Sequence, residues 1–489
     1  MEVCSGSFRS ILALGRKRLG NLMKYAWQNN SNPRPERRGG RRVSEEFNQL
    51  KEKIRDHIKA FRCCSSHYGR NKTPHKRYLP GSLNIQKMWE LFKKEHPEQQ
   101  VKYHTYYTVF VQDFNLGFGN PKTDVCSFCT GHKTKLSYEE DEEKKRTLVT
   151  ELLVHRSRSR KFYQLMSTKP DDSTLLLSFD LMQNQALPKS PIGEAYYARQ
   201  LWLYVLGIIE HKPSGERGIP GEQSQEDVNF YTWGEQEMGR GANQVASALK
   251  HFLDTRLPQS PHVTKVVLFS DSCVGQNKNC VVLGMLNLVS TAHKVEFEHI
   301  FPVRGHSYMP ADRAFGRVEK RLRREETILL PSGYLAHFAT VGNVRVHGRD
   351  WHALDLKNAV EKTVKRPLPF KITEAKRIYV RPAPAPVTVS TFYSAPGAEH
   401  TILKRGKKWC TLQVDRLQLK SCVKPAKQRD VAKLLQAMGV ELVEPLVGSG
   451  PRTFLQEVGV FYKEVCEPTD AMDIDSDEED EGIIAVYED

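Results

Sequence analysis

The sequence of 489 residues lacks any apolar run of the roughly 20 residues that a helix needs to cross a bilayer. Near its start, Ile11–Leu14 is followed at once by Arg16, Lys17 and Arg18, so this segment resembles neither a signal peptide nor an anchor. We therefore expect no membrane partner. The ten cysteines are scattered, which argues against a disulfide framework and favours a reducing compartment.

Acidic residues are scarce outside the C-terminal end of the chain. Residues 467–489 hold eleven Asp or Glu and no Lys or Arg, so the formal charge of +15 becomes +26 over the preceding 466 residues. Residues 1–80 have nineteen Lys or Arg against six Asp or Glu. Such a basic body favours a polyanionic partner, most simply DNA, and a solubilising surface is the alternative.

Residues 1–43 are expected to form a disordered basic arm, because the run Arg34–Arg42 has no apolar side chain to bury. The same run has the composition of a nuclear-import patch, which predicts a nuclear location. A solvated linker is the alternative interpretation of this run.

Residues 44–137 are predicted to form a helical domain. Helices with apolar stripes are expected after the N-cap candidates Ser44 and Ser82 and from Tyr103 onward. Three short helices in a basic setting, the last two joined by a tight turn, fit a helix-turn-helix that binds DNA. A plain helical bundle is the alternative. If the domain binds DNA, its reading helix begins near Lys102, His104 and Thr105.

A C-x-x-C motif lies at Cys126–Cys129, and two cysteines at this spacing can share one tetrahedral zinc ion. Because no second C-x-x-C follows, structural cysteines are the alternative to a zinc site. The further zinc ligands available in the same domain are Cys63, Cys64 and His67.

The central part of the chain predicts an α/β domain. Residues 138–173 are densely charged and are expected to be an exposed helix or a connector between domains. Residues 174–328 then show three strands, a helix, a strand, a helix, a strand and a final helix. This order is the ribonuclease-H-like pattern, in which three leading strands form an antiparallel meander. The first and fourth strands of that mixed sheet are parallel neighbours.

Two of these strands end on isolated carboxylates. The apolar runs Leu175–Leu177 and Val266–Phe269 lead directly to Asp180 and Asp271. A carboxylate at such a place is costly unless it is paired or bound to metal. Parallel neighbours bring both side chains to the same edge of the sheet, where a divalent cation would offset their repulsion.

An acidic site of this kind fits phosphodiester chemistry with two Mg²⁺ or Mn²⁺ ions, because both cations prefer oxygen ligands. Asp180 is the best candidate to bridge the two ions, and Asp271 is the second ligand. The third acid is Asp312 or Glu319, and Asp312 is preferred because the start of the last helix lies nearer the strand ends. Glu319 can instead pair with Arg323 at i+4.

Four segments of this region carry a shared pattern: Ser178–Asn184, Tyr197–Leu201, Phe269–Asn279 and Arg304–Gly316. Together they resemble an uncharacterised transposon-derived family that is widespread in animal genomes and similar to DDE-type cut-and-paste transposases. The resemblance covers about residues 79–438. It implies a transposase-like, integrase-type core that acts on DNA, and all the expected acids are present.

Four polar residues near the acids have two interpretations each. Gln276, Asn277 and Asn279 either cap the helix that begins at Cys280 or contact a DNA backbone. His306 either contacts a phosphate or only anchors its own loop.

The C-terminal part is expected to hold a small basic α+β unit over residues 329–445 and a tail over 446–489, acidic and disordered from about 467. Three functions compete for the whole chain. The first is a DDE transposase, the second a domesticated DNA-binding or scaffold protein without catalysis, and the third a related metal-dependent nuclease. A homo-oligomer is left open.

Overall fold

The computed structural model describes residues 4–32, 44–65, 76–119, 125–168, 170–211, 227–419, 421, 423–442 and 454–466. The chain divides into two compact units, Met1–Thr123 and Asp124–Asp489. The expected domain of residues 44–137 differs from this division, because the C-x-x-C motif belongs to the second unit. No helix in the described ranges is long and apolar enough to cross a membrane.

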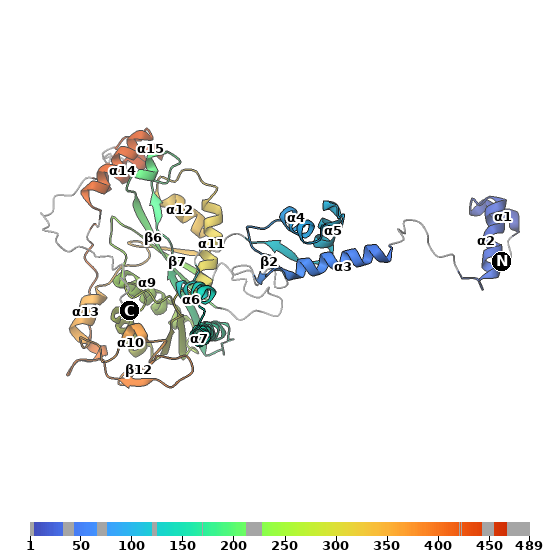
Figure 1. The fold of residues 1–489 in the computed structure, drawn as a ribbon. Coiled ribbons are helices and arrows are strands. Elements are labelled where there is room, and N and C mark those ends of the chain that lie inside the picture. Colours follow the sequence, from blue (N-terminus) through green and yellow to red (C-terminus); the bar gives the residue numbers. More distant parts are fainter. Residues whose placement is uncertain are drawn as a thin grey trace. The chain divides into compact units, whose positions relative to one another are not determined.

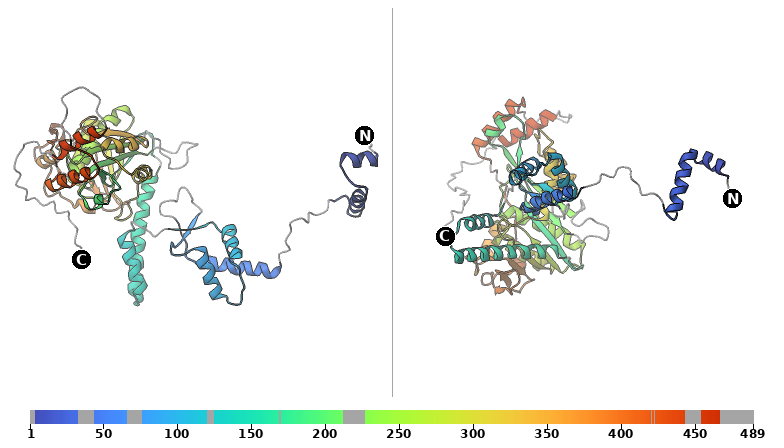
Figure 2. Two further views of the ribbon diagram at one scale, coloured as in Figure 1. Left: turned by 90° about the horizontal axis from the view of Figure 1, so that it is seen from above. Right: turned by 45° about the vertical axis from the view of Figure 1, so that its right-hand side comes forward.

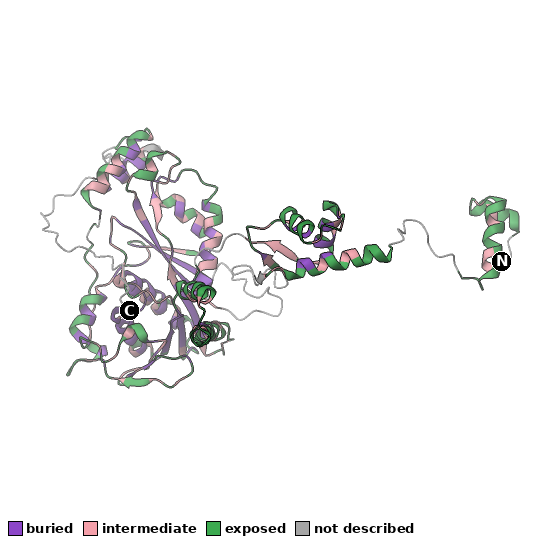
Figure 3. Cartoon of the chain, viewed as in Figure 1, coloured by how far each residue is buried: buried purple, intermediate pink, exposed green. Residues whose placement is uncertain are grey.

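The first unit begins with two helices, α1 Ser5–Ile11 and α2 Arg16–Gln28, where a disordered arm was expected. The cause is local, because the Cys4 side chain caps α1 and α2 contains no proline. Neither helix has a buried residue, and most of both is coloured as exposed in Figure 3. The basic run Arg34–Arg42 lies outside the described residues.

Three further helices of the first unit share one core: α3 Glu45–Ala60, α4 Ile85–Glu95 and α5 Tyr103–Asp113. The predicted cap of α3 is confirmed, since Ser44 accepts a hydrogen bond from the Phe47 N–H at 3.3 Å. The start of α4 was predicted wrongly. It is capped by Asn84 rather than Ser82, because the Asn84 side chain accepts from the N–H of Lys87 at 2.8 Å.

A small sheet that the sequence did not predict completes this unit. Its strands are β1 Cys64–Ser65, β2 Arg77–Leu79 and β3 Leu116–Phe118. Strand β2 pairs antiparallel with β1 and parallel with β3. Strand β2 therefore joins the chain before α4 to the chain after α5.

The second unit is a mixed α/β domain built on a ten-stranded sheet. The five central strands lie in the order β7-β6-β4-β8-β9. Strands β4, β6 and β7 form an antiparallel meander, and β4 pairs parallel with β8, so the predicted neighbours are confirmed. The strands are β4 Thr174–Leu181, β5 Gln185–Leu187, β6 Leu201–Glu210, β7 Val228–Gly234, β8 Lys265–Phe269, β9 Glu296–Ile300, β10 Asn343–Val346, β11 Arg377–Val380, β12 Val387–Ser390 and β13 Ala398–His400.

Helices cover both faces of this sheet (Figure 1). Successive side chains of β4 point to opposite faces of the sheet. Leu175 and Leu177 pack in the core under α9, α10 and α13, whereas Leu176 packs on the opposite face. A second core lies under α11, α12, α14 and α15. The bounds are α9 Ala242–Arg256, α10 Cys280–His293, α11 Pro310–Leu322, α12 Pro331–Ala339, α13 Leu356–Thr363, α14 Pro425–Ala437 and α15 Phe454–Cys466.

The charged segment of residues 138–173, expected to be an exposed helix or a connector, contains the long second helix of a helical hairpin. Helix α6 Ser127–Tyr138 contacts α7 Glu142–Ser167, and one end of the pair projects from the sheet in Figure 2. The last turns of α7 carry the fully buried Phe162, whose ring packs against Phe269 of β8. The sequence did not predict this packing, because most of α7 is exposed and charged and only one of its ends packs on the sheet.

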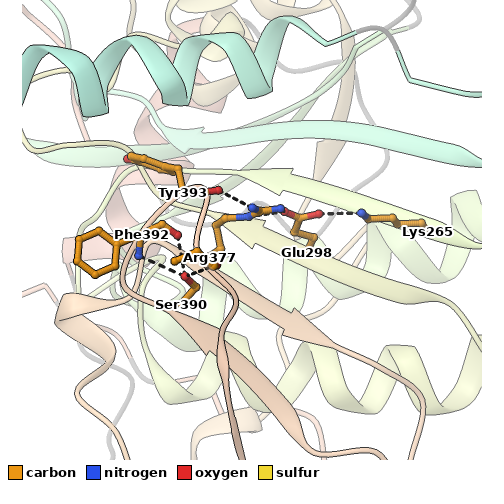
Figure 4. A network of polar contacts seen from close by, with 7 residues as sticks. Lys265, Glu298, Arg377, Ser390, Phe392 and Tyr393 are labelled. Carbon is orange, nitrogen blue, oxygen red and sulfur yellow. Dashed lines mark hydrogen bonds and ion pairs between the residues drawn. The ribbon is translucent and has the colours of Figure 1, made fainter.

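The C-terminal segment does not form a separate α+β unit but extends the central sheet. Strand β11 pairs antiparallel with β9, and β10 pairs parallel with β7 at the other side. Buried charges reinforce the first junction (Figure 4). The Glu298 carboxylate, 3% exposed, lies 2.6 Å from the Arg377 guanidinium and 2.8 Å from Lys265 Nζ. The acidic residues 467–489 lie outside the described residues.

Candidate acidic site

Asp180 and Asp271 lie at equivalent places on neighbouring parallel strands. Ser178 of β4 pairs with Phe269, the last residue of β8. Asp180 lies two residues after Ser178, and Asp271 lies two residues after Phe269. Both carboxylates are therefore at the C-terminal ends of their strands, as the sequence predicted. Asp312 lies in the first turn of α11, which packs on β4 and β6.

A close approach between α11 and the sheet depends on a glycine in β6. A Cβ atom added to Gly207 would lie only 2.8 Å from Cε1 of Phe315 on α11. Any larger residue would push the helix away from the sheet. Gly207 pairs with Asp180 across the β4–β6 ladder, so the acid and the helix approach the same place.

The three carboxylates interact electrostatically. Burial, followed by the negative charges of Asp271 and Asp312, raises the pKa of Asp180 well above its ordinary value. Burial likewise raises the pKa of Asp271 and of Asp312, and the charge of Asp271 contributes to the rise at Asp312. All three groups thus favour protonation, which is the behaviour of like charges crowded in a poorly solvated place.

Each carboxylate has one oxygen held by N–H donors. Oδ1 of Asp180 accepts from the Leu181 N–H at 2.8 Å, and Oδ2 of Asp312 accepts from the Met309 N–H at 2.7 Å. Oδ1 of Asp271 accepts from the Cys273 N–H at 3.1 Å. No ion pair to Lys or Arg neutralises any of the three within the described ranges.

Arg240 is the functional candidate that sequence reasoning missed. Its guanidinium donates to Oδ1 of Asn184 at 2.5 Å and lies within 3.3 Å of the Gln276 side-chain amide. Its positive charge also opposes the rise in the pKa of Asp180. Because β7 runs in the same direction as β4, its C-terminal loop reaches the same edge of the sheet. The predicted strand order was therefore the one signal in the sequence that could have placed Arg240 near the acids.

Asn277 is not the DNA contact that was weighed from the sequence, because it is fully buried. Its amide nitrogen instead donates to Oδ1 of Asp271 at 2.5 Å and orients that carboxylate. Asn279 is the N-cap of α10, with Oδ1 accepting from the N–H groups of Val281 and Val282 at 3.0 Å. Gln276 is half-buried beside Arg240.

Glu319, the other candidate for the third acid, lies apart from this group. Its side chain is 41% exposed, and Oε2 lies 3.7 Å from the Arg323 guanidinium, the i+4 pair that the sequence predicted. None of the aspartate pKa shifts has Glu319 as a cause. The geometry thus favours Asp312.

The C-x-x-C motif belongs to a second cluster, formed with His155 of α7 and His306 of the loop between β9 and α11. One ligand atom from each of Cys126, Cys129, His155 and His306 lies within 4.8 Å of the others. Within the described ranges, no other set of three or more His, Cys, Asp or Glu ligand atoms is gathered in this way. The carboxylates of Asp180, Asp271 and Asp312 do not meet this distance criterion.

The other residues proposed for zinc or for DNA lie in the first unit. The Cys63 thiol donates to the Phe61 carbonyl at 3.4 Å, while the Cys64 side chain and His67 lie outside the described residues. Lys102 and His104 are exposed and Thr105 is half-buried at the start of α5.

Comparison with protein families finds one match: a domain of unknown function (DUF7869) corresponds to residues 196–363. This segment runs from the end of α8, Glu194–Tyr197, through α13 and includes Asp271, Asp312, Arg240 and His306. Asp180 precedes it. A comparison with curated proteins finds no match. The family description assigns no activity, so any argument about function depends on the site itself.

Proposed function

We propose that this chain is a transposon-derived, DDE-type transposase-like enzyme that cleaves and transfers DNA strands with two Mg²⁺ or Mn²⁺ ions. The observation that carries the proposal is the placement of Asp180 and Asp271 at the C-terminal ends of adjacent parallel strands, with Asp312 in the first turn of the helix that packs on β4. Three unpaired acids in one place are unfavourable in the metal-free protein, which is the usual signature of a functional site.

The topology of the second unit supports a ribonuclease-H-like core. The order β7-β6-β4-β8-β9 places a three-stranded meander beside two parallel strands, and α9 and α10 supply the crossovers. In this arrangement the first and fourth strands carry acids at adjacent C-terminal ends, and α11 contributes the third. The resemblance to transposon-derived sequences supports the same assignment.

The residues of the acidic site are assigned separate roles in phosphodiester chemistry. Two divalent cations bound here would supply activation of a water or 3′-hydroxyl and stabilisation of the leaving oxygen. Asp180, Asp271 and Asp312 are assigned as the residues that would hold them. Asn277 holds Asp271 through Oδ1 and leaves Oδ2 available to a cation. The all-oxygen donor set suits Mg²⁺ or Mn²⁺.

Arg240 is assigned to the DNA phosphate. It is exposed, it lies beside Asp180, and Asn184 and Gln276 hold its guanidinium. A guanidinium presents donors in a fixed fork that matches a phosphate group. Its charge also offsets part of the negative charge that DNA brings to an acidic site.

The first unit is assigned to DNA binding, with α4 and α5 as a helix-turn-helix and Lys102, His104 and Thr105 near the start of the reading helix. We expect residues 44–120 to bind duplex DNA with a steep dependence on salt, because phosphate contacts release condensed counterions. Electrophoretic mobility shifts at increasing NaCl measure this dependence. A fragment with helical circular dichroism and no shift at low salt would leave only the helical bundle.

Action on DNA implies a nuclear location, and the basic N-terminal run supports it. Localisation of a fluorescent fusion, with and without residues 1–43, tests this part of the proposal.

The catalytic proposal is tested with the full chain and a duplex that carries the ends of its own element. We expect strand cleavage with Mg²⁺ or Mn²⁺ and none with EDTA. Cleavage without joining of the ends to a target duplex would identify a nuclease. Binding without cleavage under every metal condition would identify a domesticated DNA-binding protein and overturn the catalytic assignment.

A further inference from the structure

Three separate segments bring two thiols and two imidazoles together. Cys126 caps α6 and Cys129 lies in its first turn, His155 lies midway along α7, and His306 lies in the loop that leads to α11. Cys126 is buried and the other three are half-buried. All four lie within the second unit, so the cluster belongs to a single folded body.

The distances within this cluster match a tetrahedral zinc site. Sγ of Cys126 lies 3.3 Å from Nε2 of His155, and Sγ of Cys129 lies 3.4 Å from Nε2 of His306. Zinc bonds of about 2.3 Å to sulfur and 2.0–2.1 Å to nitrogen place tetrahedral S and N ligands about 3.6 Å apart. Thiol–imidazole hydrogen bonds explain each pair separately. They do not explain why two such pairs converge within 4.8 Å.

A third histidine on the hairpin provides an internal contrast. His132 lies on α6 one turn after Cys129, yet its Nε2 is 2.8 Å from the Glu151 carboxylate and its Nδ1 is 3.0 Å from the Phe128 carbonyl. Both ring nitrogens are thus engaged away from the thiols. The Phe128 ring stacks between His132 and His155, with centroids 3.8 and 4.4 Å away, and separates the two histidines.

We propose that Cys126, Cys129, His155 and His306 bind one structural Zn²⁺ ion, which ties the α6–α7 hairpin to the loop before α11. Four protein ligands fill a tetrahedral shell and leave no open position, which is the property of a structural rather than a catalytic zinc. Binding to two thiols and two neutral imidazoles releases the two thiol protons. This site is separate from the acidic one and does not depend on the proposed activity.

The same loop connects the zinc site to Asp312. Gly305 has φ +73°, and a Cβ atom there would lie 2.7 Å from Cα of Cys126, so the loop lies directly against the start of α6. The Tyr163 hydroxyl of α7 donates to the His306 carbonyl at 3.1 Å. Asp312 follows His306 by six residues. Zinc binding therefore fixes the segment from which α11 and its acid begin.

Metal content of the purified full chain tests the proposal directly. We expect about one zinc per chain by elemental analysis. Substitution with Co²⁺ should give the visible d–d bands of a tetrahedral site together with thiolate charge transfer. Cys129→Ser and His155→Asn should each lose the zinc, whereas the matched control His132→Asn should retain it. A chain without zinc, or zinc content unchanged in both ligand variants, would overturn the assignment.

Hydrogen exchange tests the role of the zinc in holding the loop, and it needs no active enzyme. Removal of zinc with a chelator should speed amide exchange in residues 303–309 and at the start of α11, while the β4 and β8 amides stay protected. Addition of Zn²⁺ alone should restore the slow exchange. If the loop exchanges at the same rate with and without zinc, the ion does not fix Asp312. Because neither readout involves DNA, the zinc proposal can fail while the catalytic one stands, and the reverse.

Discussion

Asp312→Asn should remove metal-dependent DNA cleavage as fully as Asp180→Asn or Asp271→Asn, whereas Glu319→Gln should retain most of it. A lost metal ligand takes one negative charge from a site for two dications, and a neutral amide cannot replace it. Several kcal/mol of transition-state stabilisation correspond to a loss of roughly a thousandfold or more in rate. The exposed Glu319–Arg323 pair is worth at most about 0.5 kcal/mol of stability.

The Asp312→Asn variant separates two roles of Asp312, metal binding and capping of α11. Its Oδ2 accepts from the Met309 N–H and helps to cap α11. The amide oxygen of asparagine can accept the same bond, so Asp312→Asn should keep the helix and lose only the charge. If capping were the sole role of Asp312, this variant would cleave at the normal rate.

Cleavage rates at fixed Mg²⁺ for equally soluble, folded variants decide among the outcomes. Loss of activity in Glu319→Gln with retention in Asp312→Asn would reverse the assignment. Loss in both would mean that the two residues act together. Activity retained in both would place the third acid elsewhere.

The second large effect is on stability, where Asp180→Asn should make the metal-free protein more stable while it abolishes cleavage. Burial and the charges of Asp271 and Asp312 raise the pKa of Asp180, so its ionised form opposes folding. Removal of that charge should raise the free energy of unfolding by on the order of 1 kcal/mol, the scale at which functional sites sacrifice stability.

The dependence on pH follows from the same shift. A carboxyl whose pKa is higher in the folded than in the unfolded state binds more protons when folded, so stability falls as the pH rises. The fall begins near the ordinary value of 3.8 and continues until the pH passes the folded-state pKa. Asp271 and Asp312 act in the same direction.

Thermal unfolding in EDTA over a pH series measures both effects. The midpoint of the wild-type chain should fall more steeply above about pH 4 than that of Asp180→Asn. Mn²⁺ at neutral pH should raise the wild-type midpoint and leave the variant nearly unchanged. Glu319→Gln is the control and should follow the wild type in both respects. A less stable Asp180→Asn protein would show that the carboxylate is a structural group.

The sequence by itself determined the central strands and the place of two acids. The apolar runs that end before Asp180 and Asp271 predict buried strands, because continuous Val, Leu and Phe leave no polar face for solvent. The strand order then predicted that β4 and β8 are parallel neighbours, and their pairing confirms it. The i+4 spacing of Glu319 and Arg323 predicted their ion pair, since helix geometry is local.

Only the tertiary structure decided which distant groups meet. His155 lies on a helix whose charged pattern predicted an exposed helix or connector, and packing of the far end of that helix brings the imidazole to Cys126. Arg240 reaches Asp180 through the path of the loop after β7. The C-terminal strands join the central sheet through backbone pairing and the buried Glu298–Arg377 pair. A local sequence pattern predicts that a segment is buried but not which segment it packs against. Many segments could supply the backbone pairing and the side-chain contacts, and the rest of the chain determines which one does.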